Sequence, residues 1–377
     1  MTNPPPPDNW GPPQPGPQPP YGQGQPQYGP PGQWPQQPGW GPPPQPPKNN
    51  SLKWLLIGVA ILLVIAITVG ATLLFTRDDG GDPPTATGSS SAAGDIASAD
   101  DTGPVGIITE DPTCDPWRPI ATKLANVENQ GWNDRDPSVP AGQWTPKIRQ
   151  QHETVADAMR AAADQTNSLT RATPNRVMRE LFEQSIAYWR AYADSIPTYT
   201  ARDNHLANAA GNSSNAIVSI CNAILSRTAH ERGPAVGPGP TPNSVSAPTY
   251  PNTPFRFIEA SNSSICPEWE AMTDSFDADT AQWRESDHSV DASQRNPIHQ
   301  AVIDQAASRI SRFAQEMVEL SEQTDNPTWI DFAHLSSQYW QAYVESVPTY
   351  RASDNDLSVA AAFLAYIPLQ ACLAIQG

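Results

Sequence analysis

The residues with the most to offer chemically lie in a segment that occurs twice in the chain. Residues 188–206 read YWRAYADSIPTYTARDNHL and residues 339–357 read YWQAYVESVPTYRASDNDL, with 12 identities in 19 positions. Tyrosine rings combine an apolar body with a polar hydroxyl, which suits a groove for a glycan, peptide or lipid. The candidate groove residues are Tyr188, Tyr192, Tyr199, Tyr339, Tyr343 and Tyr350.

A simpler interpretation is that these rings pack the corner between two helices, and we favour it. Residues three and four apart share one face of a helix, so Tyr188, Tyr192 and Ser195 would lie together. Asp203 and its counterpart Asp354 would then be the N-caps of the next helix. The groove and the packed corner are alternative predictions for the same residues.

Catalytic chemistry has little support in the sequence. Acid–base catalysis needs two groups with divergent pKa values held close together. The repeated carboxyl groups are Asp194, Glu345, Asp203 and Asp354, and helix caps or solvated surface explain all four. The chain contains no Gly-x-Ser-x-Gly elbow, no His-x-x-x-His pair and no phosphate-binding glycine loop. We therefore predict no catalytic residue, cofactor or metal, and a non-enzymatic protein. The alternative is an envelope hydrolase or transferase that acts at the helix corner.

Four helices are predicted in each copy of a longer repeat. A shift of 151 residues relates the copies from Pro146 and Pro297 to the last cysteine of each. Thr145 and Asn296 precede these prolines, and such a pair is typical of an N-cap followed by the first helical turn. An apolar stripe follows at helical spacing in the second copy: Val302, Ala306, Ile310, Phe313, Met317 and Leu320. The predicted fold is all-α, with two tandem four-helix bundles that arose by internal duplication.

The cysteines are expected to close each bundle. One cysteine lies at the start of the first predicted helix of each copy and one at the end of the fourth. In an up-down-up-down bundle these points lie at the same end. Of the three pairings that four cysteines allow, Cys114–Cys221 with Cys266–Cys372 is therefore favoured. We interpret both bridges as structural, each stabilising the fold by about 4–5 kcal/mol through loop closure.

A single membrane anchor is predicted from Trp54 to Phe75, 22 residues without a charged side chain. A cleavable signal peptide is the alternative, but a leader of 53 residues and so long an apolar run argue against it. Lys48 and Lys53 before the segment, against Arg77 after it, place the N-terminus in the cytoplasm. All four cysteines follow the anchor, as expected for domains outside the cell membrane.

Composition divides the rest of the chain. Of the 43 prolines, 20 lie before residue 48, so this region cannot bury enough apolar surface to fold. It is either a spacer or a docking tail for a cytosolic protein. The predicted segments are a disordered tail at 1–50, the anchor at 54–75, a flexible linker at 77–113, a first helical repeat at 114–227, a Pro-rich linker at 228–264 and a second helical repeat at 265–377.

Charge limits the choice of partners. Residues 54–377 contain 38 acidic against 20 basic residues, which argues against nucleic acid and anionic lipid headgroups. Besides the membrane itself, the expected partners are an envelope glycan, peptide, lipid or protein outside, and a cytosolic protein for the tail.

The layout of a Pro/Gln/Gly-rich tail, one span, an acidic tether and cysteine-bracketed, alanine-rich domains resembles a known group. It is similar to uncharacterised proline-rich single-pass membrane proteins of mycobacteria and related actinobacteria. Residues 1–50 and the segment Trp54–Phe75 carry most of this resemblance. The resemblance implies an envelope location. Our hypothesis from the sequence is a non-catalytic scaffold that binds a ligand or partner through its duplicated domains.

Overall fold

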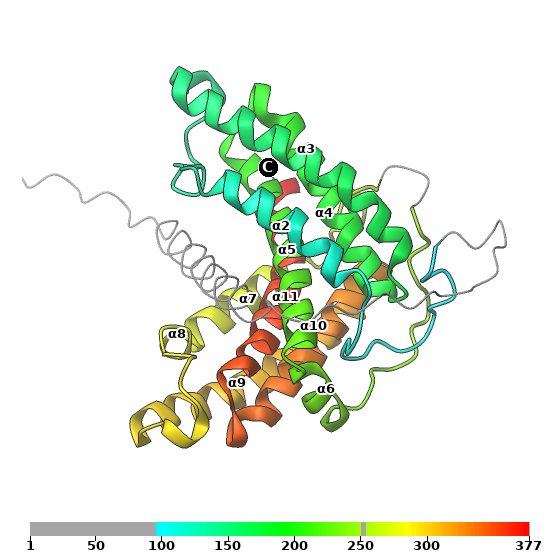
Figure 1. Cartoon of the computed structure of the whole chain (residues 1–377), viewed down its shortest axis with the longest axis vertical. Coiled ribbons are helices and arrows are strands. Elements are labelled where there is room, and N and C mark those ends of the chain that lie inside the picture. The colour runs from blue at the N-terminus through cyan, green and yellow to red at the C-terminus, as the bar shows by residue number, and fades with distance from the viewer. Residues whose placement is uncertain (1–95, 250–253, 377) are drawn as a thin grey trace, which may run out of the picture. The chain divides into compact units, whose positions relative to one another are not determined.

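The computed structural model describes residues 96–249 and 254–376, and the regular structure in these residues is helical (Figure 1). The predicted tail and the predicted anchor lie outside the described residues, as do residues 77–95 of the first predicted linker.

Each predicted repeat contains four main helices. In the first repeat they are α2 (Cys114–Glu128), α3 (Pro146–Ala172), α4 (Arg176–Ser195) and α5 (Asn204–Leu225). In the second they are α7 (Cys266–Asp279), α9 (Pro297–Ser321), α10 (Pro327–Ser346) and α11 (Asn355–Ile375), with a short helix α8 (Ala281–Arg284) after α7. Helix α6 (Thr228–Arg232) follows the first repeat.

Two side-chain caps predicted from the sequence are present. Thr145 Oγ1 accepts a hydrogen bond from the Ile148 amide at 3.3 Å, and Asn296 Oδ1 accepts one from the His299 amide at 2.8 Å. Proline follows each cap in the first turn, where its missing N–H would have no helical partner. These signals therefore set the starts of α3 and α9.

Asp203 and Asp354 act differently from the simple N-caps that the sequence predicted. The chain enters α5 and α11 through short 3-10 turns, which place each aspartate at the third residue of its turn. The carboxylate then accepts a hydrogen bond from the amide three residues earlier, Thr200 at 2.7 Å and Arg351 at 2.8 Å. Both aspartates therefore occupy the predicted N-cap positions of α5 and α11, but their side chains cap the preceding 3-10 turn instead of the α-helix.

The cysteines are joined in the pairs that their positions favoured. Cys114 bonds to Cys221 and Cys266 bonds to Cys372, over sequence separations of 107 and 106 residues. Each bridge connects the start of its repeat's first helix to the end of the fourth. Every cysteine of the chain is accounted for by these two bonds.

The two repeats are packed together, although the sequence suggested separate bundles. Helices α5 and α11 run antiparallel: His205 near the start of α5 donates to Gln370 Oε1 near the end of α11 at 2.8 Å. At the other end of the pair, Asp356 of α11 accepts a hydrogen bond from Asn222 of α5. All described residues fall in one compact unit. The repeats therefore behave as one body because their fourth helices share an interface.

Helix α11 is the most apolar of the described helices. Together with the preceding turn, Ala352–Ile375 is the one stretch in the described part that is long and apolar enough to cross a membrane, with a mean hydropathy of 1.9. Most of this stretch is buried within the protein, and Cys372 is bonded to Cys266 of α7. These contacts are typical of a core helix, because a helix that is apolar all round is buried when other protein elements surround it.

The described parts of the two predicted linkers pack against the helices. We call residues 96–113 the first leader and residues 236–249 with 254–265 the second leader. Val105 and Ile108 are buried in the first leader, and Phe257 and Ile258 in the second. The Gly239 amide donates to the Val105 carbonyl at 2.8 Å and so joins the leaders to each other. A few apolar side chains anchor each segment despite its polar and Pro-rich composition.

Candidate functional site at the junction of the repeats

The six tyrosines of the repeated segment lie in the core. Each is at most 2 % exposed, and they occupy equivalent places in the two repeats. Tyr192 accepts a hydrogen bond from Trp132 Nε1 at 3.0 Å, and Tyr343 accepts one from Trp283 at 2.7 Å. In both cases the donor lies on the chain between the first and second long helices. The tyrosines thus fasten this connection to the third helix.

A second pair of tyrosines closes the same corner. The Tyr199 hydroxyl donates to the Pro137 carbonyl at 3.0 Å and the Tyr350 hydroxyl donates to the His288 carbonyl at 2.7 Å. Burial raises the pKa of Tyr199 to about 12, so it remains a hydrogen-bond donor at neutral pH. Donors and acceptors recur 151 residues apart, and the repeated segment is therefore explained by internal contacts.

The open aromatic groove predicted as one alternative finds no support in this arrangement. Tyr188 and Tyr339 are as buried as the other four tyrosines, at 1 % and 0 % exposure. His152 lies 2.9 Å from the Tyr192 hydroxyl and stacks on Trp144, and burial lowers the pKa of His152 to about 4. It is neutral at physiological pH. These buried rings contact other protein side chains. The alternative prediction, a packed corner between two helices, therefore explains their positions.

The carboxyl groups considered for catalysis are likewise engaged. Asp354 is fully buried and pairs with Arg232 Nη2 at 2.7 Å, while exposed Asp194 lies 3.2 Å from Arg160. Among residues 96–249 and 254–376, no group of three or more His, Cys, Asp or Glu is arranged to hold a metal ion. The polar groups at this corner stabilise the turn between the third and fourth helices.

The densest buried polar cluster lies elsewhere, where α4 meets α10. Arg176, the first residue of α4, binds Asp331 of α10 with two hydrogen bonds of 2.6 and 3.1 Å. Its guanidinium also donates to the carbonyls of Asp101 and Gly103 in the first leader, at 2.7 and 3.2 Å. Arg176 and Asp331 are each 1 % exposed. One side chain therefore joins the first repeat, the second repeat and the leader.

The next turn of α4 extends this cluster. Arg179 donates to the Ser246 carbonyl of the second leader at 2.8 Å and lies 3.7 Å from Glu183. Glu183 accepts two hydrogen bonds from Thr249, from its amide at 3.1 Å and its hydroxyl at 3.0 Å. Burial raises the pKa of Glu183. The polar side chains of α4 therefore hold the second leader in place through its backbone.

Glu180 lies in this cluster, and neither of its carboxyl oxygens has a hydrogen-bond partner among the described residues. Burial, reinforced by the neighbouring Asp331 carboxylate, raises the pKa of Glu180 well above its ordinary value. Glu180 and Asp331 are equivalent positions of the two repeats, 151 residues apart. Two like-charged groups face each other here, and one of them is best held in its protonated form.

Each leader crosses to the third helix of the other repeat. Tyr188 of α4 lies close to Arg256 and Glu259 of the second leader, and Tyr339 of α10 lies beside the Ile108 backbone of the first leader. This reciprocal crossing explains why α4 is buried without interruption from Arg176 to Trp189. This cluster was not predicted from the sequence, although charged residues at consecutive turns of an otherwise apolar helix indicate buried polar contacts.

Asp356 gives the interface between α5 and α11 a dependence on pH. Burial raises the pKa of Asp356 to about 7, above its value of 3.8 in an unfolded chain. The folded state therefore binds the proton more tightly, and stability falls as pH rises from about 4 to about 7.

We expect Asp356→Asn to raise the melting temperature at pH 8 and to flatten its change between pH 5 and pH 8. Thermal unfolding followed by circular dichroism measures this, with exposed Asp274→Asn as the matched control. A pH profile identical to wild type would contradict the assignment.

The described part is thus an all-helical unit with two disulfides, whose buried polar side chains hold the two repeats and the two leaders together. The chain belongs to the family described as mycobacterial ESX-1 associated protein, which matches residues 96–377. It is 41 % identical over 347 residues to an uncharacterised protein of Mycolicibacterium smegmatis (strain MKD8), covering 91 % of each chain. No solved structure matches it.

Proposed function

We propose that this chain is a membrane-anchored envelope protein that acts without catalysis as a binding scaffold associated with the ESX-1 secretion system. The observation that carries the proposal is that the described residues form one compact unit, in which the candidate catalytic and groove residues are used for internal contacts. Membership of an ESX-1 associated family supports a protein partner. A compact unit suits a scaffold because a preformed surface loses little entropy on binding.

The proposal includes the finer architecture. The unit would be an internal duplication of a four-helix bundle, supported by the corner hydrogen bonds that recur 151 residues apart. The segment Trp54–Phe75 would anchor it, with the Pro-rich tail in the cytoplasm and the helical unit outside. The two disulfides support an oxidising location for the helical unit.

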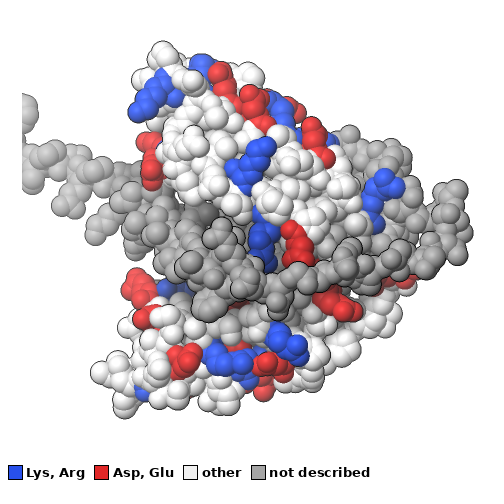
Figure 2. Space-filling model, viewed as in Figure 1, with Lys and Arg blue, Asp and Glu red and all other residues white. Residues whose placement is uncertain are grey.

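Surface charge distinguishes the two repeats. Residues 265–377 contain 17 carboxylates, five arginines and no lysine, whereas residues 114–227 contain 11 carboxylates and 12 basic residues. The face in Figure 2 shows charges of both signs, so it does not by itself locate the acidic excess of the second repeat. We therefore compared single helices of the two repeats. Helix α7 exposes Glu268 and Asp274, and α2 has Pro116 and Thr122 at the equivalent places. We infer that α7 docks a basic surface of the partner.

A secretion assay in a mycobacterial strain with its own ESX-1 system tests this proposal. Deleting the gene should lower the amount of ESX-1 substrate in the culture filtrate, and the wild-type gene should restore it. The double variant Glu268→Lys/Asp274→Lys should fail to restore secretion while being produced normally. The matched variant Glu153→Lys/Asp157→Lys, on the exposed face of α3, should restore it. Unchanged secretion after deletion would show that the proposed function is wrong; full restoration by the α7 variant would rule out only that docking face.

A further inference from the structure

A hollow of about 450 Å³ opens between the second leader and the turn from α9 to α10. This volume lies within the range of small-molecule sites, which is roughly 300–1,000 Å³. Its lining includes Phe255, Ser261, Ser264, Gln323, Asp325 and Thr328. Its lining contains neither the tyrosines of the repeated segment nor Glu268 and Asp274 of α7, so the inference below rests on the proposed envelope location but not on the proposed docking face.

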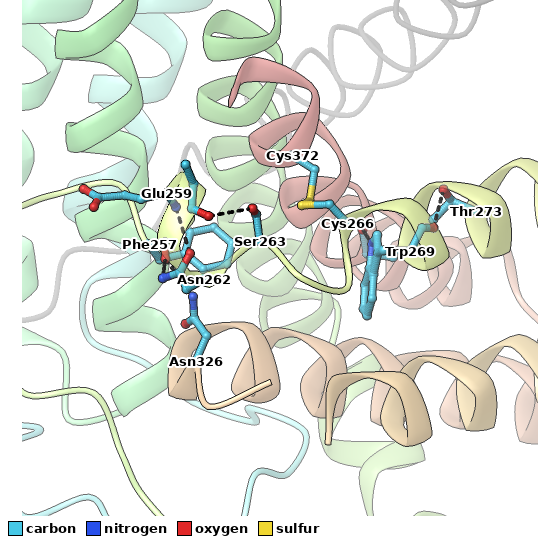
Figure 3. The surroundings of a disulfide bond; sticks show 11 residues. Phe257, Glu259, Asn262, Ser263, Cys266, Trp269, Thr273, Asn326 and Cys372 are labelled. Atoms are coloured by element: carbon cyan, nitrogen blue, oxygen red, sulfur yellow. Dashed lines mark hydrogen bonds between the residues drawn. A yellow bond between two sulfur atoms is a disulfide. The ribbon is translucent and has the colours of Figure 1, made fainter. Parts of the chain in front are cut away.

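The wall of the hollow is held rigidly from behind. Asn262 and Asn326 both donate to the Phe257 carbonyl, at 3.0 and 2.7 Å, and Figure 3 shows the two amides converging on this residue. The Phe257 ring packs edge-on against Phe332 of α10 with its centroid 5.5 Å away. Asn326 also caps α10 by accepting from the Trp329 amide. The hollow is therefore preformed, which favours ligand binding because little order has to be created.

Some polar side chains of the lining are not used by the fold, in contrast to Asn262 and Asn326. Within the described residues, the side chains of Ser261, Ser264, Gln323 and Asp325 make no hydrogen bond, although hydroxyl, amide and carboxylate groups are all represented. Phe255 is 61 % exposed, whereas most other aromatic rings among the described residues are buried. An exposed ring beside several uncommitted polar groups is an arrangement suited to a ligand with one apolar face and many hydroxyls.

We propose that this hollow binds a neutral sugar residue of an envelope polysaccharide, with the sugar ring stacked on Phe255. Pyranose C–H groups pack on an aromatic face while the hydroxyls hydrogen-bond to Gln323, Asp325 and the serines. Asp325 is the charged group of the lining, and Glu322 is exposed close by in the chain, so an anionic ligand would be repelled. The polar lining disfavours an acyl chain, because its hydrogen-bonding groups would be left without partners.

The test uses the full chain in a polyoxyethylene detergent, which has no sugar headgroup. Chitotetraose, mannotetraose and a neutral Gly-Ser tetrapeptide are titrated separately, and binding is followed by saturation-transfer NMR of the added molecule. At least one tetrasaccharide should bind with a Kd of about 1 mM or tighter, as a stacked ring with a few hydrogen bonds allows.

Phe255→Ala and Gln323→Ala should each weaken sugar binding about tenfold or more, since each removes one principal contact. Ile298→Ala is the matched control, because Ile298 is 80 % exposed and distant in the chain from the hollow, and it should bind like wild type. The proposal is overturned if neither tetrasaccharide binds, if Phe255→Ala binds as wild type does, or if only the tetrapeptide binds. None of these results bears on the secretion assay.

Discussion

Replacing Arg176 with methionine should destabilise the folded protein by about 3–5 kcal/mol, because it leaves Asp331 buried without its partner. The substitution also removes the bonds to the Asp101 and Gly103 carbonyls, so the first leader should be held less firmly against α4. The effect should be larger at pH 8 than at pH 5. Burial already raises the pKa of Asp331, and without Arg176 a lower pH would let this carboxyl take up a proton and relieve part of the cost.

Urea unfolding followed by far-UV circular dichroism would measure the loss. Arg160→Met is the matched control: Arg160 is also a helix arginine paired with aspartates, but its side chain is 45 % exposed, so its removal should cost less than about 1 kcal/mol. The double variant Arg176→Met/Asp331→Leu should recover much of the stability, because no buried charge then lacks a partner. Equal losses for Arg176→Met and Arg160→Met would mean that the junction is solvated in solution.

Local signals in the sequence predicted the local structure well. The caps at Thr145 and Asn296 depend on residues a few positions apart, and the structure has both. The cysteine pairs followed from the order of the helices alone, since each repeat has its cysteines at its two ends. Such features need no knowledge of which distant segments meet.

The junction could not be predicted in this way because its partners are far apart in the chain. Arg176 and Asp331 are separated by 155 residues, and the position equivalent to Arg176 in the second repeat is Pro327. The repeat comparison therefore gave no hint of an ion pair. The packing of the leaders was not predictable for a related reason: composition averages over a segment, whereas single apolar residues such as Phe257 and Ile258 are buried and hold it in place.

One difference between the repeats leads to a prediction that uses the protein as its own control. In the second repeat, Pro368 lies inside α11 and has no N–H, so the Leu364 carbonyl four residues earlier has no donor within the helix. Trp269 Nε1 donates to the neighbouring carbonyl, that of Ala365, at 3.0 Å. In the first repeat Ile217 stands where Pro368 does, and the buried Trp117 indole has no acceptor among the described residues.

Trp269→Phe should therefore destabilise the protein more than Trp117→Phe, by about 1–2 kcal/mol. Both changes shrink a fully buried ring, but only Trp269→Phe breaks a hydrogen bond, whereas Trp117→Phe removes an unpaired N–H. Urea unfolding of the two variants gives the difference directly. Equal costs for the two tryptophans would show that ring volume alone sets the loss and that the bond to the Ala365 carbonyl adds nothing to stability.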